Sequence, residues 1–217
     1  MMNLPLLFWA SEETGDNRYT DMARAHADCC AKYIVREDGS SYHGYLMDPD
    51  TGEAVRGITY QGYEDESTWA RGEAWLIYGF TLAYEYTGET AYLDVAKKTA
   101  AYFTDNLPED NVTYWDFTFD DGNPDIKDTS ATAIAASGLL ELADCADAED
   151  LATYRLQAKE MLAGLYAHYF VANTNRLCVL KDGMYHYEDG NESLIWGDYF
   201  YYEALVHLLD PDYERFW

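Results

Sequence analysis

The segment from 57 to 75 carries the densest group of side chains able to bind a polar ligand. Trp69, Arg71 and Trp75 lie near its end, and Gln61 precedes them. On a helix, the six-residue spacing places the two tryptophans roughly 120° apart. Two such rings can bracket a pyranose, and a guanidinium between them can bind a carboxylate through two parallel hydrogen bonds. The pattern therefore predicts a site for a sugar acid, with Gln61 contacting hydroxyl groups.

A structural role accounts for the same residues. Arg71 would pair with Glu66 or Glu73 at the beginning of a helix. Both tryptophans would then pack in the core, as large aromatic side chains commonly do. Spacing alone leaves the two interpretations open.

The chain is strongly acidic, with 40 Asp and Glu against 14 Lys and Arg and a formal net charge of −26. This charge repels nucleic acids and anionic membranes, so we expect neither as a partner. It also repels an acidic sugar at long range. A few local cations must therefore capture such a ligand, since salt screens the global field beyond about 8 Å. The 21 Tyr and 6 Trp suit either sugar-facing clefts or helix packing.

No pattern of cysteine or histidine indicates a metal centre. Cys29 and Cys30 are adjacent, Cys145 and Cys178 stand alone, and none forms a C-x-x-C pair. The five histidines are scattered. We expect four buried free thiols in a reducing, cytoplasmic compartment, with no metal and no other cofactor.

The run from Met1 to Ala10 is apolar and typical of a buried helix. It lacks the basic residues and cleavage site of a signal peptide, Glu12 and Glu13 follow it directly, and it is too short to span a membrane. An apolar helix here predicts a partner surface outside the chain. We therefore expect the chain to be the C-terminal part of a larger helical protein.

A repeated frame predicts how the helices are connected. The pattern T-G-x-x-x-Y-x-D-x-A occurs at 14–23 and at 87–96, and a fainter copy keeps only Tyr154 and Ala158. Glycine tolerates the left-handed conformation in which many helices end, so each copy predicts the turn of an antiparallel helix hairpin. Periodicity and stop signals predict seven helices, the third with Ser67 or Thr68 near its N-cap: 3–14, 18–35, 67–87, 90–106, 129–145, 149–171 and 197–209.

The segments between these helices predict short strands. Alternating residues from Ser41 to Met47 lead into the turn from Asp48 to Gly52, which favours a β-hairpin, and a second short pair is expected around 181–183. Repeated helix hairpins build an open solenoid or a closed ring, and long loops rich in Trp, Tyr, Asp and Gln favour a ring with a cleft at one end. We predict an all-α fold, an incomplete α/α toroid of about seven helices forming one domain over 1–217.

Several collinear blocks carry a family resemblance. The most specific is W-A-R-G-E-A-W-L-I-Y-G-F at 69–80, and the others lie at 3–16, 42–52, 61–69, 114–117, 128–142 and 196–205. Together they resemble the unsaturated glucuronyl hydrolases of glycoside hydrolase family 88. The unsaturated rhamnogalacturonyl hydrolases, which share the ring, fit these blocks less well.

The resemblance implies an (α/α)6 six-hairpin toroid, of which this chain would be the C-terminal half to two thirds. It implies, as substrates, glycosaminoglycan-type disaccharides left by polysaccharide lyases, with a 4,5-unsaturated uronic acid at the non-reducing end. The family hydrates the C4=C5 double bond: an Asp protonates C4 and activates water for C5, and the hemiketal opens and releases the second sugar. Seven positions would contact sugar: His43, Gln61, Trp69, Arg71, Trp75, Tyr185 and His186.

The resemblance also implies that the acid is missing. The proton-transferring Asp of the family would lie about two positions before Met1, and a second important Asp further upstream. We therefore assign no catalytic residue and expect the chain alone to be inactive or nearly so. Three internal carboxyls near the cleft are candidates to replace that acid: Asp65, Asp116 and Asp128. Three positions depart from the family's common residues, with Tyr60 for His, Glu73 for Gln and Lys127 for Arg.

Two other functions stay open. A non-catalytic carbohydrate-binding or assembly module would pair its apolar faces with a second copy or with a separately made N-terminal half. A plain helical scaffold would bind no sugar, and His43 and His186 would then be ordinary hairpin and turn residues.

Overall fold

The chain folds as a row of helix hairpins. The computed structural model describes residues 1–172, 177–186, 189–210 and 212–215, and these contain seven α-helices. They are α1 (Leu4–Thr14), α2 (Arg18–Tyr33), α3 (Ala70–Thr87), α4 (Thr90–Asp105), α5 (Thr129–Asp144), α6 (Ala148–Tyr169) and α7 (Ile195–Leu209). All seven predicted helices are confirmed, each boundary to within three residues. None of the described helices is long and apolar enough to cross a membrane.

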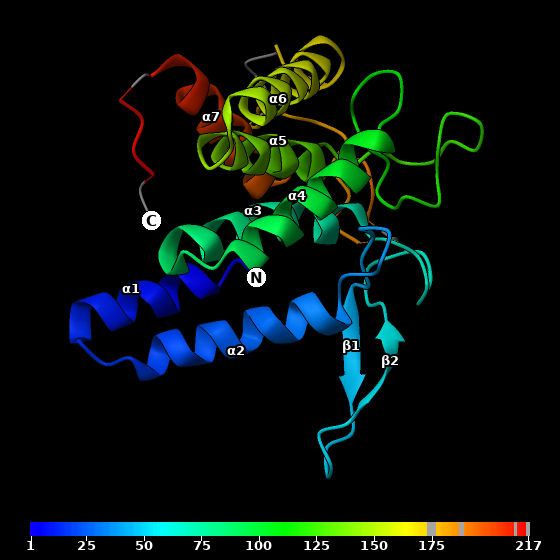
Figure 1. The fold of residues 1–217 in the computed structure, drawn as a ribbon. Helices are drawn as coiled ribbons and strands as arrows, with labels where there is room; N and C mark the ends of the chain where they lie inside the picture. The colour runs from blue at the N-terminus through cyan, green and yellow to red at the C-terminus, as the bar shows by residue number, and fades with distance from the viewer. Residues whose placement is uncertain (173–176, 187–188, 211, 216–217) are drawn as a thin grey trace.

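The helices form two layers. α1–α2, α3–α4 and α5–α6 are consecutive hairpins, and α7 follows them (Figure 1). α3 packs against both α1 and α5, and α5 packs against α7, so α1, α3, α5 and α7 make one row. α2, α4 and α6 pack behind this row. This alternation of inner and outer helices is the arrangement expected for part of an α/α toroid.

The repeated frame marks helix turns, as predicted. Gly15 and Gly88 follow α1 and α3 with φ of 70° and 69°, the left-handed conformation that favours glycine. The alanine of each copy is fully buried in the core: Ala23, Ala96 and Ala158. The faint third copy has no such glycine, and α5 ends on Cys145 in a right-handed conformation.

α1 is buried on one face only. Leu4 and Phe8 pack in the core, whereas Leu6 and Trp9 are 65% and 52% exposed. Among the described residues no element covers this outer face, so the partner surface predicted from the sequence, which would lie outside the chain, stays a prediction. The predicted burial of the cysteines is wrong. All four are free and partly exposed, and Cys29 and Cys30 lie on α2, whose buried side chains are two alanines.

The predicted β-hairpin is confirmed. Strand β1 (Gly44–Met47) pairs antiparallel with β2 (Ala54–Ile58), with a register shift beside Leu46. The second predicted pair is wrong: Leu180 pairs with Phe170 and Gly183 with Glu192. Asp182 lies between them with φ of 62°, so the chain turns there and the two sides do not pair with each other.

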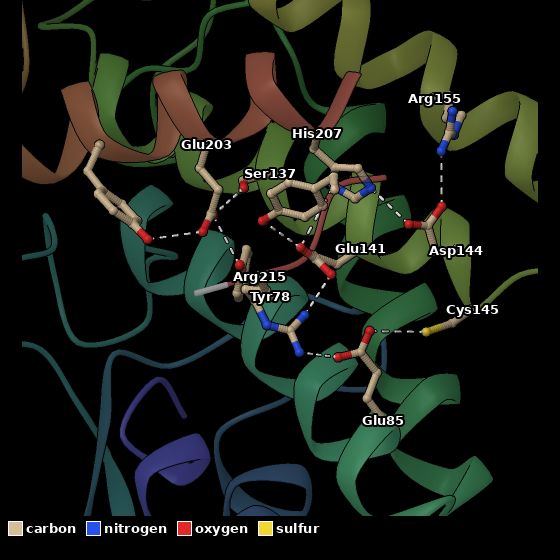
Figure 2. A network of polar contacts seen from close by, with 12 residues as sticks. Tyr78, Glu85, Ser137, Glu141, Asp144, Cys145, Arg155, Glu203, His207 and Arg215 are labelled. Carbon is tan, nitrogen blue, oxygen red and sulfur yellow. Dashed lines mark hydrogen bonds and ion pairs between the residues drawn. The ribbon is translucent and has the colours of Figure 1, made fainter. Parts of the chain in front are cut away.

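The C-terminal ends of the inner helices carry a cluster of charged side chains, which Figure 2 shows. Arg215, from the segment after α7, lies 2.6 Å from Glu85 of α3 and 2.7 Å from Glu141 of α5. The ring of Tyr213 stacks on His207 of α7, with centroids 4.3 Å apart. We call Glu85, Glu141 and Arg215 the far-end clamp. It joins the C-terminal ends of α3 and α5, whereas the predicted site lies near their N-terminal ends.

Candidate functional site

The predicted site residues lie near the N-terminal ends of the inner helices. Trp69 is the N-cap of α3, where the sequence predicts Ser67 or Thr68. The helix begins later because the backbone before it is already paired: Phe117 N–H donates to the Thr68 carbonyl at 2.9 Å, and Ala70 N–H to the Trp115 carbonyl at 3.0 Å. Ser67 instead donates its hydroxyl to Asp116 at 2.7 Å.

Three predicted residues line one cavity of about 480 Å³ among α2, the β-hairpin and α3: His43, Trp69 and Trp75. The rings of His43 and Trp69 overlap, with centroids 4.4 Å apart. Trp75 is half-buried, with its edge against Phe200. The cavity is therefore lined by aromatic rings and an imidazole, a combination suited to a sugar ring.

His43 is held at one ring nitrogen. Its Nδ1 lies 3.1 Å and 3.2 Å from the backbone nitrogens of Tyr60 and Gln61, and 3.1 Å from Oγ1 of Thr59. Burial, and then the positive charge of Arg71, lower the pKa of His43 to about 4. The imidazole is therefore neutral at pH 7.

Arg71 is buried and has several partners. Its Nη1 lies 2.6 Å from Oδ2 of Asp128 and donates to the Met184 carbonyl at 2.5 Å, and its Nη2 donates to the Tyr185 carbonyl at 3.0 Å. The guanidinium also lies over the Trp69 ring at 4.6 Å. The prediction that Arg71 would pair with Glu66 or Glu73 in a structural role is wrong. Arg71 instead joins α3 to the capping residue of α5 and to the 184–185 backbone.

Gln61 contacts the loop that carries Tyr185 and His186, which we call the late loop. Gln61 donates its side-chain amide to the Tyr185 carbonyl at 2.8 Å, the same oxygen that Arg71 binds. Tyr185 is 52% exposed, and its ring packs on that of Trp196 with the centroids 5.9 Å apart. His186 is partly exposed, and its backbone pairs with Asp189. The structure thus brings Gln61, Arg71 and Tyr185 together, while His43, Trp69 and Trp75 line the neighbouring cavity.

The three internal carboxyls are occupied by structural bonds. Asp128 caps α5 by accepting from two backbone amides and pairs with Arg71. Asp116 accepts from Tyr63 N–H and from the Ser67 hydroxyl. Asp65 accepts from Thr59 N–H and pairs with Arg56, and these bonds lower the pKa of Asp65. None of the three is placed as a free acid.

The sequence interpretation misses two contributors to this region. Thr59 contacts His43, and Trp115 forms the wall of a second cavity of about 450 Å³ together with Tyr60, Tyr63 and Phe119. The block at 114–117 points to the second cavity, because it carries Trp115. No local pattern points to Thr59, since its contact with His43 joins the two sides of a hairpin.

Glu73, by contrast, lies outside both cavities. It is fully buried in α3, and neither carboxyl oxygen has a hydrogen-bond partner in the described part of the chain. Burial raises the pKa of Glu73 to about 8, although the nearby Ser41 hydroxyl and Arg36 oppose this. The group is therefore mostly a neutral carboxylic acid at pH 7.

Comparison with known proteins agrees with the fold. The chain is 42% identical to the unsaturated chondroitin disaccharide hydrolase of Streptococcus pyogenes serotype M1, over all of this chain and 56% of that protein. It is 43% identical to the unsaturated glucuronyl hydrolase of Bacillus sp. strain GL1, over 96% of this chain and 57% of that protein. The chain thus spans little more than half the length of these relatives.

Solved structures give the same answer. The crystal structure of the Bacillus sp. GL1 enzyme superposes with a TM-score of 0.90 at 41% identity, over 96% of this chain and 57% of that one. A variant of the Streptococcus agalactiae unsaturated glucuronyl hydrolase, complexed with dGlcA-GalNAc6S, gives a TM-score of 0.88 at 40% identity, over 99% of this chain and 58% of that one. The predicted toroid fold is therefore confirmed. The profile of Glycosyl Hydrolase Family 88 matches residues 1–207, and the chain belongs to this family.

Proposed function

We propose that the protein containing this chain removes the unsaturated uronic acid from disaccharides released by polysaccharide lyases. In this proposal the chain supplies one wall of the sugar-binding cleft. The observation that carries the proposal is the cavity lined by His43, Trp69 and Trp75 at the N-terminal ends of the inner helices. Relatives named as unsaturated chondroitin disaccharide and glucuronyl hydrolases support this substrate class.

The chemistry would be hydration of the C4=C5 double bond. A proton adds to C4 and the oxygen of water adds to C5, and opening of the resulting hemiketal releases the second sugar. This reaction needs a carboxyl group able to give and take a proton beside the bound ring. Because Asp65, Asp116 and Asp128 are occupied by other bonds, turnover would depend on an acid placed by another part of the protein.

The residues of this chain would bind and orient the sugar. Trp75 would offer aromatic surface to the sugar, Trp69 would line the cavity behind His43, and His43 would offer a polar ring nitrogen. Tyr185 and His186 would contact the sugar from the late loop, with Gln61 and Arg71 fixing the Tyr185 carbonyl beneath them. The negative charge of the chain makes such local contacts necessary, since long-range attraction of a uronate is absent.

A second candidate function is a non-catalytic binding or assembly module. It is favoured by the exposed Leu6 and Trp9 on α1, which suit contact with a second copy or with the remaining part of a toroid. Binding of disaccharide without turnover, together with self-association, is the result expected from this candidate.

One experiment tests both. The isolated chain is mixed with the unsaturated disaccharides of chondroitin or hyaluronan, and binding heat and loss of the ultraviolet absorbance of the double bond are recorded. We expect binding with little or no turnover. Trp75→Ala should abolish the binding, whereas Trp9→Ala, the same change on the remote α1, should not. Rapid turnover by the chain would contradict the need for an outside acid, and absence of binding would contradict the sugar-binding wall.

A further inference from the structure

The turn after β2 surrounds one nitrogen of His43 with donors. Two consecutive backbone N–H groups, of Tyr60 and Gln61, point to Nδ1 at 3.1 Å and 3.2 Å. The Thr59 hydroxyl lies 3.1 Å from the same nitrogen. A backbone N–H can only donate, so an Nδ1 that carried its own proton would face two further protons. The neutral ring must therefore keep Nδ1 as an acceptor and carry its proton on Nε2.

The opposite nitrogen is available to a ligand. In the described part of the chain, Nε2 of His43 makes no hydrogen bond and does not belong to the buried unpaired atoms. The ring lines the 480 Å³ cavity together with Trp69 and Trp75. An N–H donor thus faces the space where the proposed sugar would lie.

Thr59 is itself fixed in place. Its hydroxyl oxygen accepts from Gly62 N–H at 2.7 Å, and its own N–H donates to Asp65 at 2.9 Å. Since Gly62 N–H occupies a lone pair of Oγ1, the Thr59 hydroxyl proton is free to point at His43. A Cβ on Gly62 would come within 2.7 Å of that oxygen, so the turn has room only for glycine.

We infer that Thr59 is a positioning residue: with the amides of Tyr60 and Gln61 it holds His43 as the Nε2–H tautomer, so that His43 donates a hydrogen bond to an oxygen of the bound sugar. The ligand side of this inference rests on the proposed function. The tautomer itself does not, and it can be measured without any ligand. The acceptor would be a carboxylate, hydroxyl or ring oxygen, each of which has a lone pair for Nε2–H.

The low pKa of His43 fits this role. A protonated ring would present a second proton to the same two backbone amides, and the Arg71 guanidinium adds a positive charge nearby. Arg71 from α3 is the charged group that acts on this ring, and Tyr60 meets its edge at 5.8 Å. His43 should therefore remain a neutral donor across the range in which exposed histidines titrate, around pH 6.5.

The first test is NMR of the histidine ring nitrogens in the isotope-labelled chain, with His43→Gln used to assign the signal. We expect Nε2 protonated, Nδ1 unprotonated, and no titration above about pH 5. A proton on Nδ1, or titration near pH 6.5, would overturn the inference.

Thr59 variants test the positioning role. Thr59→Val removes the hydroxyl but keeps the shape, so loss of one donor to Nδ1 should raise the pKa of His43, while the amides of Tyr60 and Gln61 still keep the proton of the neutral ring on Nε2. Thr59→Ser should behave as the parent chain does. Thr51→Val makes the same change in the exposed turn of the hairpin and should leave His43 unaltered. If Thr59→Val leaves the pKa of His43 unchanged, Thr59 has no positioning role.

Disaccharide binding tests the donor role. Gln carries an amide N–H that reaches toward the Nε2 position, whereas Asn places its polar group nearer Nδ1. His43→Gln should therefore bind about fivefold more tightly than His43→Asn, the value of one ordinary hydrogen bond. Equal affinities, or the reverse order, would contradict the donor role. If the parent chain binds no disaccharide, the proposed function fails while the tautomer result stands.

Discussion

Arg71 is the residue whose loss should damage the fold most. Its side chain is 4% exposed and that of its partner Asp128 is fully buried, so removing the guanidinium leaves a buried carboxylate without its counter-charge. Breaking such a pair costs about 3–5 kcal/mol. Arg71→Gln should lower the free energy of unfolding by about that amount, measured by urea denaturation.

The matched control is Arg24→Gln, which breaks the exposed pair with Glu89. Exposed pairs contribute about 0–1 kcal/mol, so the two variants should differ clearly. A similar small loss in both would mean that Asp128 is satisfied by Ser130 and the backbone alone.

The partners of single residues are what the sequence predicts least well. Arg71 stands out as a cation between two tryptophans, but Asp128 lies 57 positions away, and only the packing of α3 on α5 brings them together. The same holds for Gln61 and Tyr185, which are 124 positions apart. Glu66 and Glu73 are closer to Arg71 in the sequence and look like better partners. In the structure, however, Glu66 lies in the loop before α3, and the buried Glu73 carboxyl makes no hydrogen bond in the described part of the chain.

At the scale of one helix, Glu73 should make α3 less stable as pH rises. Its pKa is raised from an ordinary value near 4.5 to about 8, so the folded chain holds this proton more tightly than the unfolded chain. Stability from this group is therefore full below about pH 4.5 and is lost as pH rises toward 8. Glu73→Gln removes the titration and should unfold at a higher temperature than the parent at pH 8.

The gain of Glu73→Gln should shrink as pH falls toward 5, where the parent carboxyl is neutral too. Glu160→Gln, on the exposed face of α6, should show no such trend. Equal melting curves for Glu73→Gln and the parent from pH 5 to 8 would show that folding does not raise the pKa of this carboxyl.

The far-end clamp should link α3 and α5 in a pH-dependent way. Burial raises the pKa of Glu141 to about 7, while Arg215 opposes that rise. Arg215→Gln removes this opposition, so the folded chain loses more stability than the parent as pH rises from about 5 to 8 and Glu141 ionises. Thermal unfolding across this range should show the gap between variant and parent widening.

A double variant separates charge from packing at the clamp. Arg215→Gln with Glu141→Gln leaves neutral groups in place of the pair and should recover part of the loss at pH 8. No recovery would mean that Arg215 stabilises mainly through contacts of its stem and through Glu85.

Helices follow from the sequence far better than the loops that carry the site. Gly15 and Gly88 end α1 and α3 by local conformational preference, so their frame locates the hairpin turns. The beginning of α3 depends instead on pairing of its preceding backbone with Trp115 and Phe117, which no local pattern contains. The bridges of the 180–192 region depend on distant partners in the same way.

The inner row of helices ends in two edges that carry exposed apolar side chains. In the middle of the inner row, α5 buries nearly all its side chains and α3 buries most of its own. The two outer members of that row do not: Leu6 and Trp9 of α1 are exposed, as are Ile195 and Tyr202 of α7, at 75% and 68%. Under the proposed function, these edges would be the surfaces that contact another copy or the remaining part of a toroid.

Such edges should make the isolated chain associate. We expect sedimentation velocity to show concentration-dependent oligomers, and Leu6→Lys with Trp9→Lys to shift the chain toward monomer without changing its unfolding temperature, because both side chains are already exposed. Val55→Lys, at a 57% exposed position on β2 away from both edges, is the control. A chain that stays monomeric at high concentration would show that these edges do not attract each other.

The salt dependence of this association identifies the forces that drive it. Two copies with a formal charge of −26 each repel one another, and added salt shortens the range of that repulsion. Contact between apolar edges is not weakened by screening, so oligomers should increase when salt rises from low to physiological concentration. An interface made of ion pairs would respond in the opposite direction. Loss of oligomers on adding salt would therefore place the contact on charged surfaces and away from the edges formed by α1 and α7.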